Sequence, residues 1–257
     1  MKKGNDKKGK KIAGRIIFFA LLAVFITTGS VALYNIIVTE ARYTAAQQEY
    51  TTLREYSPQE AEIPETGPAD EANTTNESDD PVEGSNDSVA LSDLNPDYIG
   101  WIRIDGTGID YPVVQGADND KYQRRTFMGE KNASGTIFMD NLCTGVFKGY
   151  SILYGHNMRD GSMFAQLHHF LEEDFLEAYP DIMIFNPDGE ILIFRIFEVK
   201  ITHTWDPVFT LSDSSQETVD EFFAGYGIVP GSDILILSTC TTGAKSERLL
   251  VFAERST

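Results

Sequence analysis

The chain has 257 residues, with 21 Lys and Arg against 39 Asp and Glu, which gives a formal net charge of −18. This balance argues against nucleic acid as a partner, because phosphate binding requires clustered basic side chains. The two cysteines are too few for a disulfide framework and lack zinc-site spacing, so we expect neither disulfides nor a structural metal.

The N-terminal 38 residues have the pattern of a membrane anchor. Residues 1–15 carry seven basic residues and one acidic residue, and Ile16 to Val38 is a run of 23 residues without a formal charge. About 20 apolar residues cross the hydrocarbon core of a bilayer, and basic residues on the N-terminal side keep that end in the cytoplasm. We therefore expect a cytoplasmic tail at 1–15, a transmembrane signal-anchor at 16–38 and the rest of the chain outside the membrane. A cleaved signal peptide ending near Ser30-Val31-Ala32 stays open as an alternative.

Residues 39–88 carry 13 acidic and two basic residues and predict a spacer. Thr39 to Tyr56 contains helix-forming residues and would leave the membrane as a polar helix. Ser57 to Ser88 is rich in Glu, Asp, Asn, Thr, Pro and Gly, which is typical of a flexible, self-repelling linker. The linker would hold a folded domain, residues 89–257, away from the membrane surface. Secretion without a disulfide framework indicates a bacterial cell surface.

Short β-rich runs separated by turn residues fill the domain from Val89 onward. Turn residues stand at Asp105-Gly106, at Asn186-Pro187-Asp188-Gly189 and at Pro230-Gly231. The predicted strands are, in chain order, Ile99–Ile104, Ile109–Val114, Gly135–Met139, Tyr150–Gly155, Asp181–Phe185, Glu190–Thr204, Asp233–Thr239 and Leu249–Phe252. Helical periodicity predicts helices over Ser162–Phe170 and Ser214–Tyr226. Many strands and few helices favour a closed β-barrel or a sandwich over a doubly wound sheet.

Three polar residues at the ends of predicted strands are candidates for catalysis. His156 follows the strand that begins at Tyr150, and a side chain in that place is held rigidly yet reaches solvent. Cys240 ends an apolar strand, and Arg248 opens the returning strand, which would place its guanidinium beside the thiol. A guanidinium favours the thiolate and stabilises an oxyanion. Together the three residues predict an acyl-transfer site.

Structural interpretations of these residues also stay open. Cys240 has the alternative of a buried core cysteine and Arg248 that of a salt bridge at the rim of the barrel. The remaining histidines and the second cysteine are interpreted as structural residues at the surface or the core edge: His168, His169, His203 and Cys143.

Several segments resemble the sortase family, and their details resemble its class B. Ile236-Leu237-Ser238-Thr239-Cys240 is similar to the nucleophile motif Thr-Leu-x-Thr-Cys, and Tyr154 to Phe164 is similar to the histidine segment of class B members. Further matches over roughly residues 90–255 are Asn95–Ile102, Ile109–Gln115, Gly135–Asp140 and the helix-bearing insertion Asp206–Gly231. Ile236 departs from the motif but lies within the apolar strand, so we expect it to be tolerated. Thr242 stands where some class B members carry an acidic residue, so we assign no aspartate partner to His156.

The resemblance implies a closed, eight-stranded sortase-type β-barrel with a few short helices and the activity of a cysteine transpeptidase. Cys240 would attack the backbone carbonyl of a sorting motif in a secreted surface protein and form a thioacyl-enzyme. His156 would protonate the departing amine, and Arg248 would hold the substrate backbone and the oxyanion. An amine of a peptidoglycan precursor would then accept the acyl group. Neither a metal nor an organic cofactor is implied.

The class B resemblance also implies substrate contacts by Asn119, Tyr154 and Ser238. Three alternatives stay open: a pilin-polymerising sortase that uses a lysine of another subunit, a secreted cysteine endopeptidase that uses water, and a non-enzymatic wall-binding module. In the linker, Ile63-Pro64-Glu65-Thr66-Gly67 resembles the sorting signal Leu-Pro-x-Thr-Gly. It is either a chance match in an acidic linker or a tethered pseudo-substrate that visits the active site.

Overall fold

The structure is a computed structural model that describes residues 4–58 and 90–256, with side chains from Phe18 onward. It divides into two units, Met1–Gln48 and Glu49–Thr257. The pentapeptide Ile63–Gly67 and most of the predicted linker lie outside the described residues.

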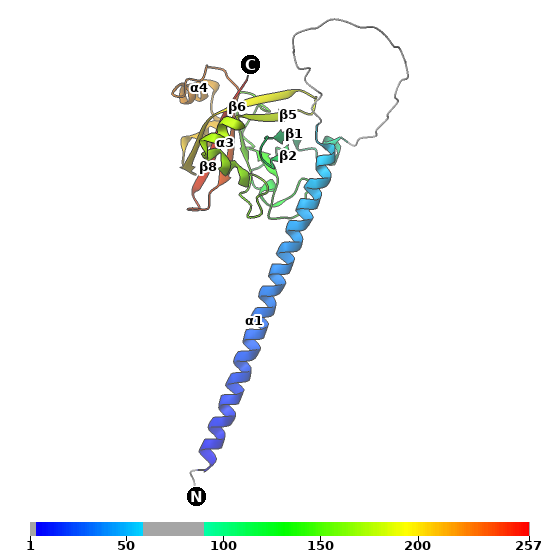
Figure 1. Cartoon of the computed structure of the whole chain (residues 1–257), viewed down its shortest axis with the longest axis vertical. Helices are drawn as coiled ribbons and strands as arrows, with labels where there is room; N and C mark the ends of the chain where they lie inside the picture. Colours follow the sequence, from blue (N-terminus) through cyan, green and yellow to red (C-terminus); the bar gives the residue numbers. More distant parts are fainter. Residues whose placement is uncertain (1–3, 59–89, 257) are drawn as a thin grey trace, which may run out of the picture. The chain divides into compact units, whose positions relative to one another are not determined.

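Helix α1 spans Gly4–Leu53, and its residues up to Gln48 belong to the first unit (Figure 1). It is the one helix of the described residues that is long and apolar enough to cross a membrane. Its most apolar 18-residue window has a mean hydropathy of 2.0 and no buried residue. Helices that are apolar all round bury themselves in protein or in lipid. This makes α1 the membrane-anchor candidate, although a signal segment near an N-terminus has the same properties.

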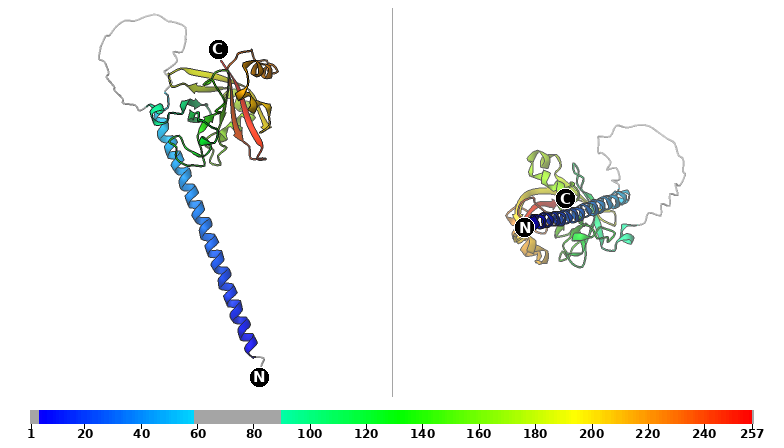
Figure 2. Two further views of the ribbon diagram at one scale, coloured as in Figure 1. Left: turned by 180° about the vertical axis from the view of Figure 1, so that it is seen from behind. Right: turned by 90° about the horizontal axis from the view of Figure 1, so that it is seen from below.

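The second unit is built on a closed barrel of eight strands, as the resemblance implied (Figures 1 and 2). The strands follow one another around the barrel in the order β1-β2-β3-β4-β7-β8-β6-β5. The β2–β3 and β4–β7 pairs are parallel, and all the other neighbours are antiparallel. Closure leaves no unpaired sheet edge, which a sandwich would have. The strands are β1 (Tyr98–Arg103), β2 (Asp110–Val114), β3 (Ile137–Met139), β4 (Tyr150–Tyr154), β5 (Asp181–Phe185), β6 (Ile191–His203), β7 (Ile234–Cys240) and β8 (Glu247–Arg255).

All eight predicted strands are observed, with small shifts at their ends. The largest shift is in β8, which starts two residues before the predicted Leu249 and continues to Arg255. This extension pairs with β6 along its whole length, from His203↔Glu247 to Phe194↔Arg255. The sequence did not predict this extension, because the residues at both ends of β8 are polar and only its central residues are buried.

The connections contain short helices, of which two were predicted. The segment expected to be helical at Ser162–Phe170 forms a 3-10 helix, η3 (Ala165–Leu171), whose buried residues Leu167 and Phe170 are three residues apart. That spacing is one turn of a 3-10 helix, so the predicted α-helical period is wrong here. The second prediction is observed as α4 (Gln216–Ala224), where the Ser215 hydroxyl accepts a hydrogen bond from Thr218 N. The polar helix expected over Thr39–Tyr56 is observed as the end of α1 followed by η1 (Arg54–Tyr56). The elements without a predicted counterpart are α2 (Leu91–Leu94), η2 (Lys121–Arg124), α3 (Glu173–Ala178) and η4 (Pro207–Asp213).

The segment from Glu49 to Pro58 packs on the barrel, although the sequence placed it in the spacer. Leu53 is buried, and Arg54 donates hydrogen bonds from Nε to Asp110 O (3.1 Å) and from Nη2 to Gly108 O (3.3 Å). The folded unit therefore begins upstream of the boundary expected at residue 89. Charge and composition could not show this, because the segment contributes only a few apolar side chains to the barrel surface.

Candidate active site

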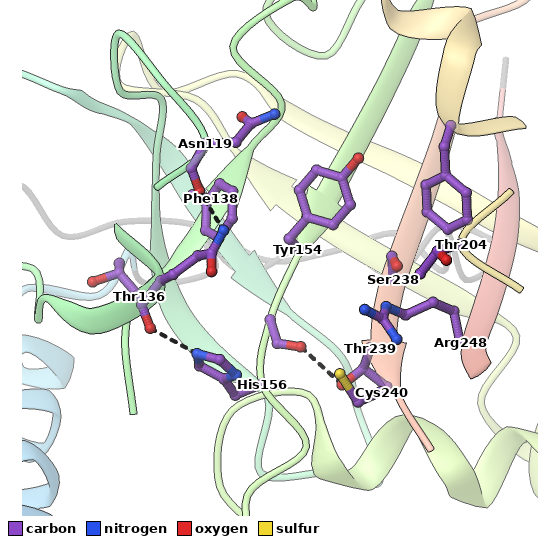
Figure 3. Close-up of a pocket in the computed structure, with 13 residues that line it drawn as sticks. Asn119, Thr136, Phe138, Tyr154, His156, Thr204, Ser238, Thr239, Cys240 and Arg248 are labelled. Atoms are coloured by element: carbon purple, nitrogen blue, oxygen red, sulfur yellow. Dashed lines mark hydrogen bonds between the residues drawn. The ribbon is translucent and has the colours of Figure 1, made fainter. Parts of the chain in front are cut away.

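The strand directions bring the three catalytic candidates to one edge of the barrel. β4 and β7 are parallel, so their C-terminal ends lie at the same edge, where Tyr154 pairs with Ser238. β8 runs antiparallel to β7 and therefore starts at that edge, which makes Arg248 the cross-strand partner of Cys240. His156 follows β4 by two residues. Figure 3 shows Cys240 with His156 on one side and Arg248 on the other.

A cleft of about 340 Å³ lies over this edge. All six residues predicted to act in catalysis or substrate binding line it, together with seven others (Figure 3). The lining residues are Asn119, Gln123, Thr136, Phe138, Tyr154, Gly155, His156, Thr204, Phe209, Ser238, Thr239, Cys240 and Arg248. The residues interpreted as structural, Cys143 and the other histidines, are not part of this lining.

Cys240 is the one exposed residue of an otherwise buried strand. The preceding Thr239 is buried and donates a hydrogen bond from Oγ1 to Gly155 O (2.8 Å). Asn157 donates from Nδ2 to Cys240 O (2.9 Å), so β7 is tied to the histidine loop on both sides of the thiol. A rigid strand end with an exposed sulfur is what a nucleophile requires. The alternative of a buried core cysteine is therefore wrong.

Arg248 is held by the hairpin that carries it. Its Nη1 donates to Lys245 O (2.8 Å) and to Glu247 O (2.7 Å), while the Glu247 carboxylate accepts a hydrogen bond from Thr241 Oγ1 (2.8 Å). Within the described part of the chain Arg248 forms no salt bridge, so the rim ion pair is not observed. The guanidinium is half-buried against the cleft, and Nε and Nη2 are not used by these two bonds. Those N–H groups are available to a substrate carbonyl or an oxyanion.

His156 is oriented by a backbone carbonyl. Its Nε2 lies 2.7 Å from Gln123 O, in η2. A carbonyl oxygen can only accept, so Nε2 carries the proton of this bond and Nδ1 is left for proton transfer. The loop that presents the ring is tightly packed, since a Cβ at Gly155 would lie 2.5 Å from the Phe164 ring and 2.6 Å from Ile137. The position therefore requires glycine.

A buried carboxylate organises the opposite wall of the cleft. Asp140 is 5% exposed, and its Oδ2 accepts hydrogen bonds from Asn119 Nδ2 (3.0 Å) and Tyr154 OH (3.0 Å). Its Oδ1 accepts from Leu142 N (2.9 Å), and Asn119 Oδ1 accepts from Asn141 N (2.9 Å). Burial and the Asp140 charge raise the pKa of the Tyr154 hydroxyl, which stays protonated and donates to Asp140. Tyr154 therefore presents its oxygen to the cleft as a hydrogen-bond acceptor.

Comparison with known proteins identifies the family. A family model described as the Sortase domain matches residues 102–256. The chain belongs to the sortase family. Two curated relatives are both named Sortase B: that of Listeria monocytogenes is 37% identical over 171 residues, and that of Staphylococcus aureus is 28% identical over 179 residues. These matches cover 62% and 64% of this chain and 68% and 72% of the relatives.

Solved structures agree with this assignment. Clostridium perfringens sortase B is 33% identical with a TM-score of 0.60, and the match covers 65% of this chain and 98% of that one. A Staphylococcus aureus sortase B–substrate complex is 28% identical with a TM-score of 0.58, and covers 65% of this chain and 83% of that one. The predicted class B fold is confirmed. Sortases are cysteine transpeptidases, so the chain is an enzyme of that type and not a wall-binding module without activity.

The structure shows the surroundings of Ile236 and Thr242, the two residues at which this sortase departs from the family pattern. Ile236 is fully buried and pairs with Ile152 and Phe252, so an apolar side chain fits the core of the barrel. Thr242 is exposed in the loop after β7. The groups that sequence reasoning missed are Asp140 and the Gln123 carbonyl. Asp140 ended a family-like motif without an assigned role, whereas a backbone carbonyl leaves no signal in the sequence.

Replacing Asp140 by asparagine is expected to raise KM for peptide substrate about tenfold with a smaller change in kcat. The amide has one acceptor oxygen where the carboxylate has two, so either Leu142 N or the pair of Asn119 and Tyr154 loses its acceptor, which costs about 1–3 kcal/mol. Steady-state kinetics with Asp213→Asn as the control measure the effect, since Asp213 is exposed. An Asp140→Asn enzyme with the KM of the wild type would show that the wall binds no substrate.

Proposed function

We propose that Cys240, His156 and Arg248 carry out two successive acyl transfers on a sorting motif of secreted surface proteins. The observation that supports this most strongly is the cross-strand pair of Cys240 and Arg248 beside the end of β4. With His156 lining the same cleft, this pair supports the joint action of a nucleophile, an oxyanion donor and a proton carrier. A relative, the sortase B of Staphylococcus aureus, is known in a complex with substrate.

In the first transfer the Cys240 thiol passes its proton to His156 Nδ1, and the sulfur attacks the scissile carbonyl carbon. The carbonyl oxygen takes the negative charge and is bound by the free N–H groups of Arg248. The C–N bond then breaks, and the departing amine takes the proton back from His156. A thioester on Cys240 holds the new C-terminus of the surface protein.

In the second transfer an amine of a peptidoglycan precursor attacks the thioester carbon. His156 accepts the proton of this amine, the C–S bond breaks, and His156 passes the proton to the departing sulfur, which restores the Cys240 thiol. The surface protein ends joined to the wall precursor by a new amide bond. Splitting one amide exchange into two steps replaces one high barrier by two lower ones.

Substrate contacts are assigned to Asn119, Tyr154 and Ser238, all of which line the cleft. The buried Ser238 hydroxyl has no hydrogen-bond partner among the described residues. With the Tyr154 oxygen as an acceptor, this wall suits a substrate that offers N–H donors to it. The second N–H of Asn119 is suited to a backbone carbonyl.

The same proposal includes the location of the enzyme. Residues 1–15 form a cytoplasmic tail, 16–38 a single membrane span, and the catalytic domain lies outside the cell, because basic residues precede the apolar run. The folded unit already begins at Glu49, so residues 39–88 do not act as a spacer over their whole length. Whether the Ile63–Gly67 pentapeptide acts as a tethered pseudo-substrate stays a prediction.

The test uses the full chain in detergent micelles with a library of peptides that carry candidate sorting motifs. We expect a peptide adduct on Cys240 by mass spectrometry and, after addition of a peptidoglycan-type peptide amine, a ligated product. Hydrolysis alone in the presence of the amine would indicate an endopeptidase. Preference for the side-chain amine of a pilin lysine would indicate the pilin-polymerising alternative. A chain that forms no adduct with any motif would contradict the proposal.

A further inference from the structure

The last turn of α1 contacts Gly135 and Thr136, the two residues that precede β3. Tyr50 is 4% exposed, and its hydroxyl donates a hydrogen bond to Gly135 O (2.5 Å) and lies 3.1 Å from Thr136 Oγ1. Its ring meets Tyr111 edge-on, with 5.3 Å between the ring centroids. Glu49 accepts a hydrogen bond at Oε1 from Met128 N (2.9 Å). A tyrosine of a segment outside the barrel is thus built into the interior, with its polar end satisfied.

Gly135 and Thr136 in turn hold η2 and the residue after it. Thr136 N donates to Tyr122 O (3.0 Å), and Thr136 Oγ1 donates to Arg125 O (2.8 Å), so the two bonds bracket Gln123. Gly135 has a φ of +60°, and a Cβ there would lie 2.6 Å from Tyr122 O and 2.9 Å from Gln123 O. The close backbone approach leaves the Gln123 carbonyl little freedom to rotate.

The Gln123 carbonyl is the group that accepts the His156 Nε2 hydrogen bond. Three contacts therefore connect the end of α1 with the catalytic ring: Tyr50 to Gly135 and Thr136, Thr136 to the backbone around Gln123, and Gln123 O to His156. Thr136 and His156 both line the cleft (Figure 3). Since no acidic partner is assigned to His156, its orientation depends on this carbonyl.

We propose that Tyr50 is a positioning residue that fixes the Gln123 carbonyl and, through it, holds His156 as the Nε2–H tautomer with Nδ1 free for proton transfer. The proposal rests on the catalytic role proposed for His156. It makes a turn at the end of the anchor helix part of the support of the active site. Loss of the Tyr50 hydroxyl leaves the substrate contacts untouched but lets the Gln123 carbonyl shift, which moves the ring.

The experiment compares Tyr50→Phe with wild type in the full chain in detergent micelles. Tyr56→Phe is the matched control, because Tyr56 loses the same atom six residues further on at a site that is 40% exposed. The imidazole nitrogens are observed by long-range proton–nitrogen NMR in alkaline buffer, with His156→Gln used to assign the signals of His156. The same three proteins are measured for kcat and KM with a cleaved motif peptide.

We expect wild type and Tyr56→Phe to show the Nε2–H tautomer of His156, and Tyr50→Phe to show a mixture of tautomers. We expect kcat of Tyr50→Phe to fall roughly ten- to a hundredfold at unchanged KM, the size of effect that a small misplacement of a catalytic group produces. A Tyr50→Phe chain with the wild-type tautomer and kcat would overturn the proposal, as would an Nδ1–H tautomer in wild type.

A second pair of variants covers the case in which Tyr50→Phe does not fold. Thr136→Val removes the hydroxyl that bonds Arg125 O, and Thr136→Ser keeps it. We expect the valine variant to lose the Nε2–H tautomer and the serine variant to retain it. The NMR signals do not depend on turnover, so a wild type that transfers no peptide but shows the expected tautomers would refute the proposed function and leave this inference standing.

Discussion

Cys240→Ala is expected to lose all peptide cleavage and transfer, whereas Cys143→Ala is expected to keep them. Cys240 is exposed at the end of β7 and lines the cleft, so its sulfur meets a bound peptide. Cys143 is buried, and burial raises the pKa of its thiol, which makes it a poor nucleophile. Without a sulfur at position 240 no thioester forms, and no other group in the cleft replaces it.

Thiol alkylation followed by mass spectrometry measures the same difference in one protein. We expect the reagent to modify Cys240 first and to stop turnover when one label is bound. The Cys143→Ala chain is the control, since it should be inactivated at the wild-type rate. Residual transfer by Cys240→Ala, or inactivation that follows labelling of Cys143, would rule out the mechanism proposed for this sortase.

The sequence predicted the strands and the catalytic candidates because both leave local signals, whereas the closed barrel was chosen over a sandwich by the resemblance to sortases. β7 is an apolar run that ends at Cys240, and turn residues bound most of the strands. The spacing from Cys240 to Arg248 fits a strand, a short loop and a returning strand, and the structure pairs the two residues across β7 and β8. Such arguments need only neighbours in the sequence and the geometry of paired strands.

The parts of the site that the sequence did not predict depend on contacts between distant residues. Asp140 meets Tyr154 and Asn119 only after the barrel has closed. The partner of His156 is the main-chain oxygen of a residue 33 positions away, and a residue of any type at position 123 would supply that oxygen. Tyr50 lies 85 residues before Gly135 in a segment whose polar composition indicated a spacer. Neither periodicity nor composition reports contacts of this kind.

Arg248→Lys is expected to lower kcat/KM by about 10²–10³. In the structure one nitrogen of the guanidinium binds two carbonyls of its own hairpin, those of Lys245 and Glu247, which leaves the N–H groups of Nε and Nη2 for a ligand in the cleft that Arg248 lines. An ammonium group is a single point of charge, so it can stay with the hairpin carbonyls or bind the oxyanion, but it cannot do both. Because lysine keeps the positive charge, the decrease in kcat/KM measures the contribution of the planar guanidinium geometry.

Arg195→Lys is the matched control, because Arg195 is an exposed arginine whose guanidinium binds Asp181 on the barrel surface. Exposed ion pairs contribute little, and we expect this variant to have wild-type kinetics. Single-turnover measurements of thioester formation on Cys240 place the loss in the first transfer, where the oxyanion first develops. If Arg248→Lys forms the thioester at the wild-type rate, the arginine serves to hold the hairpin after β7, and the oxyanion must be stabilised by another donor of the cleft.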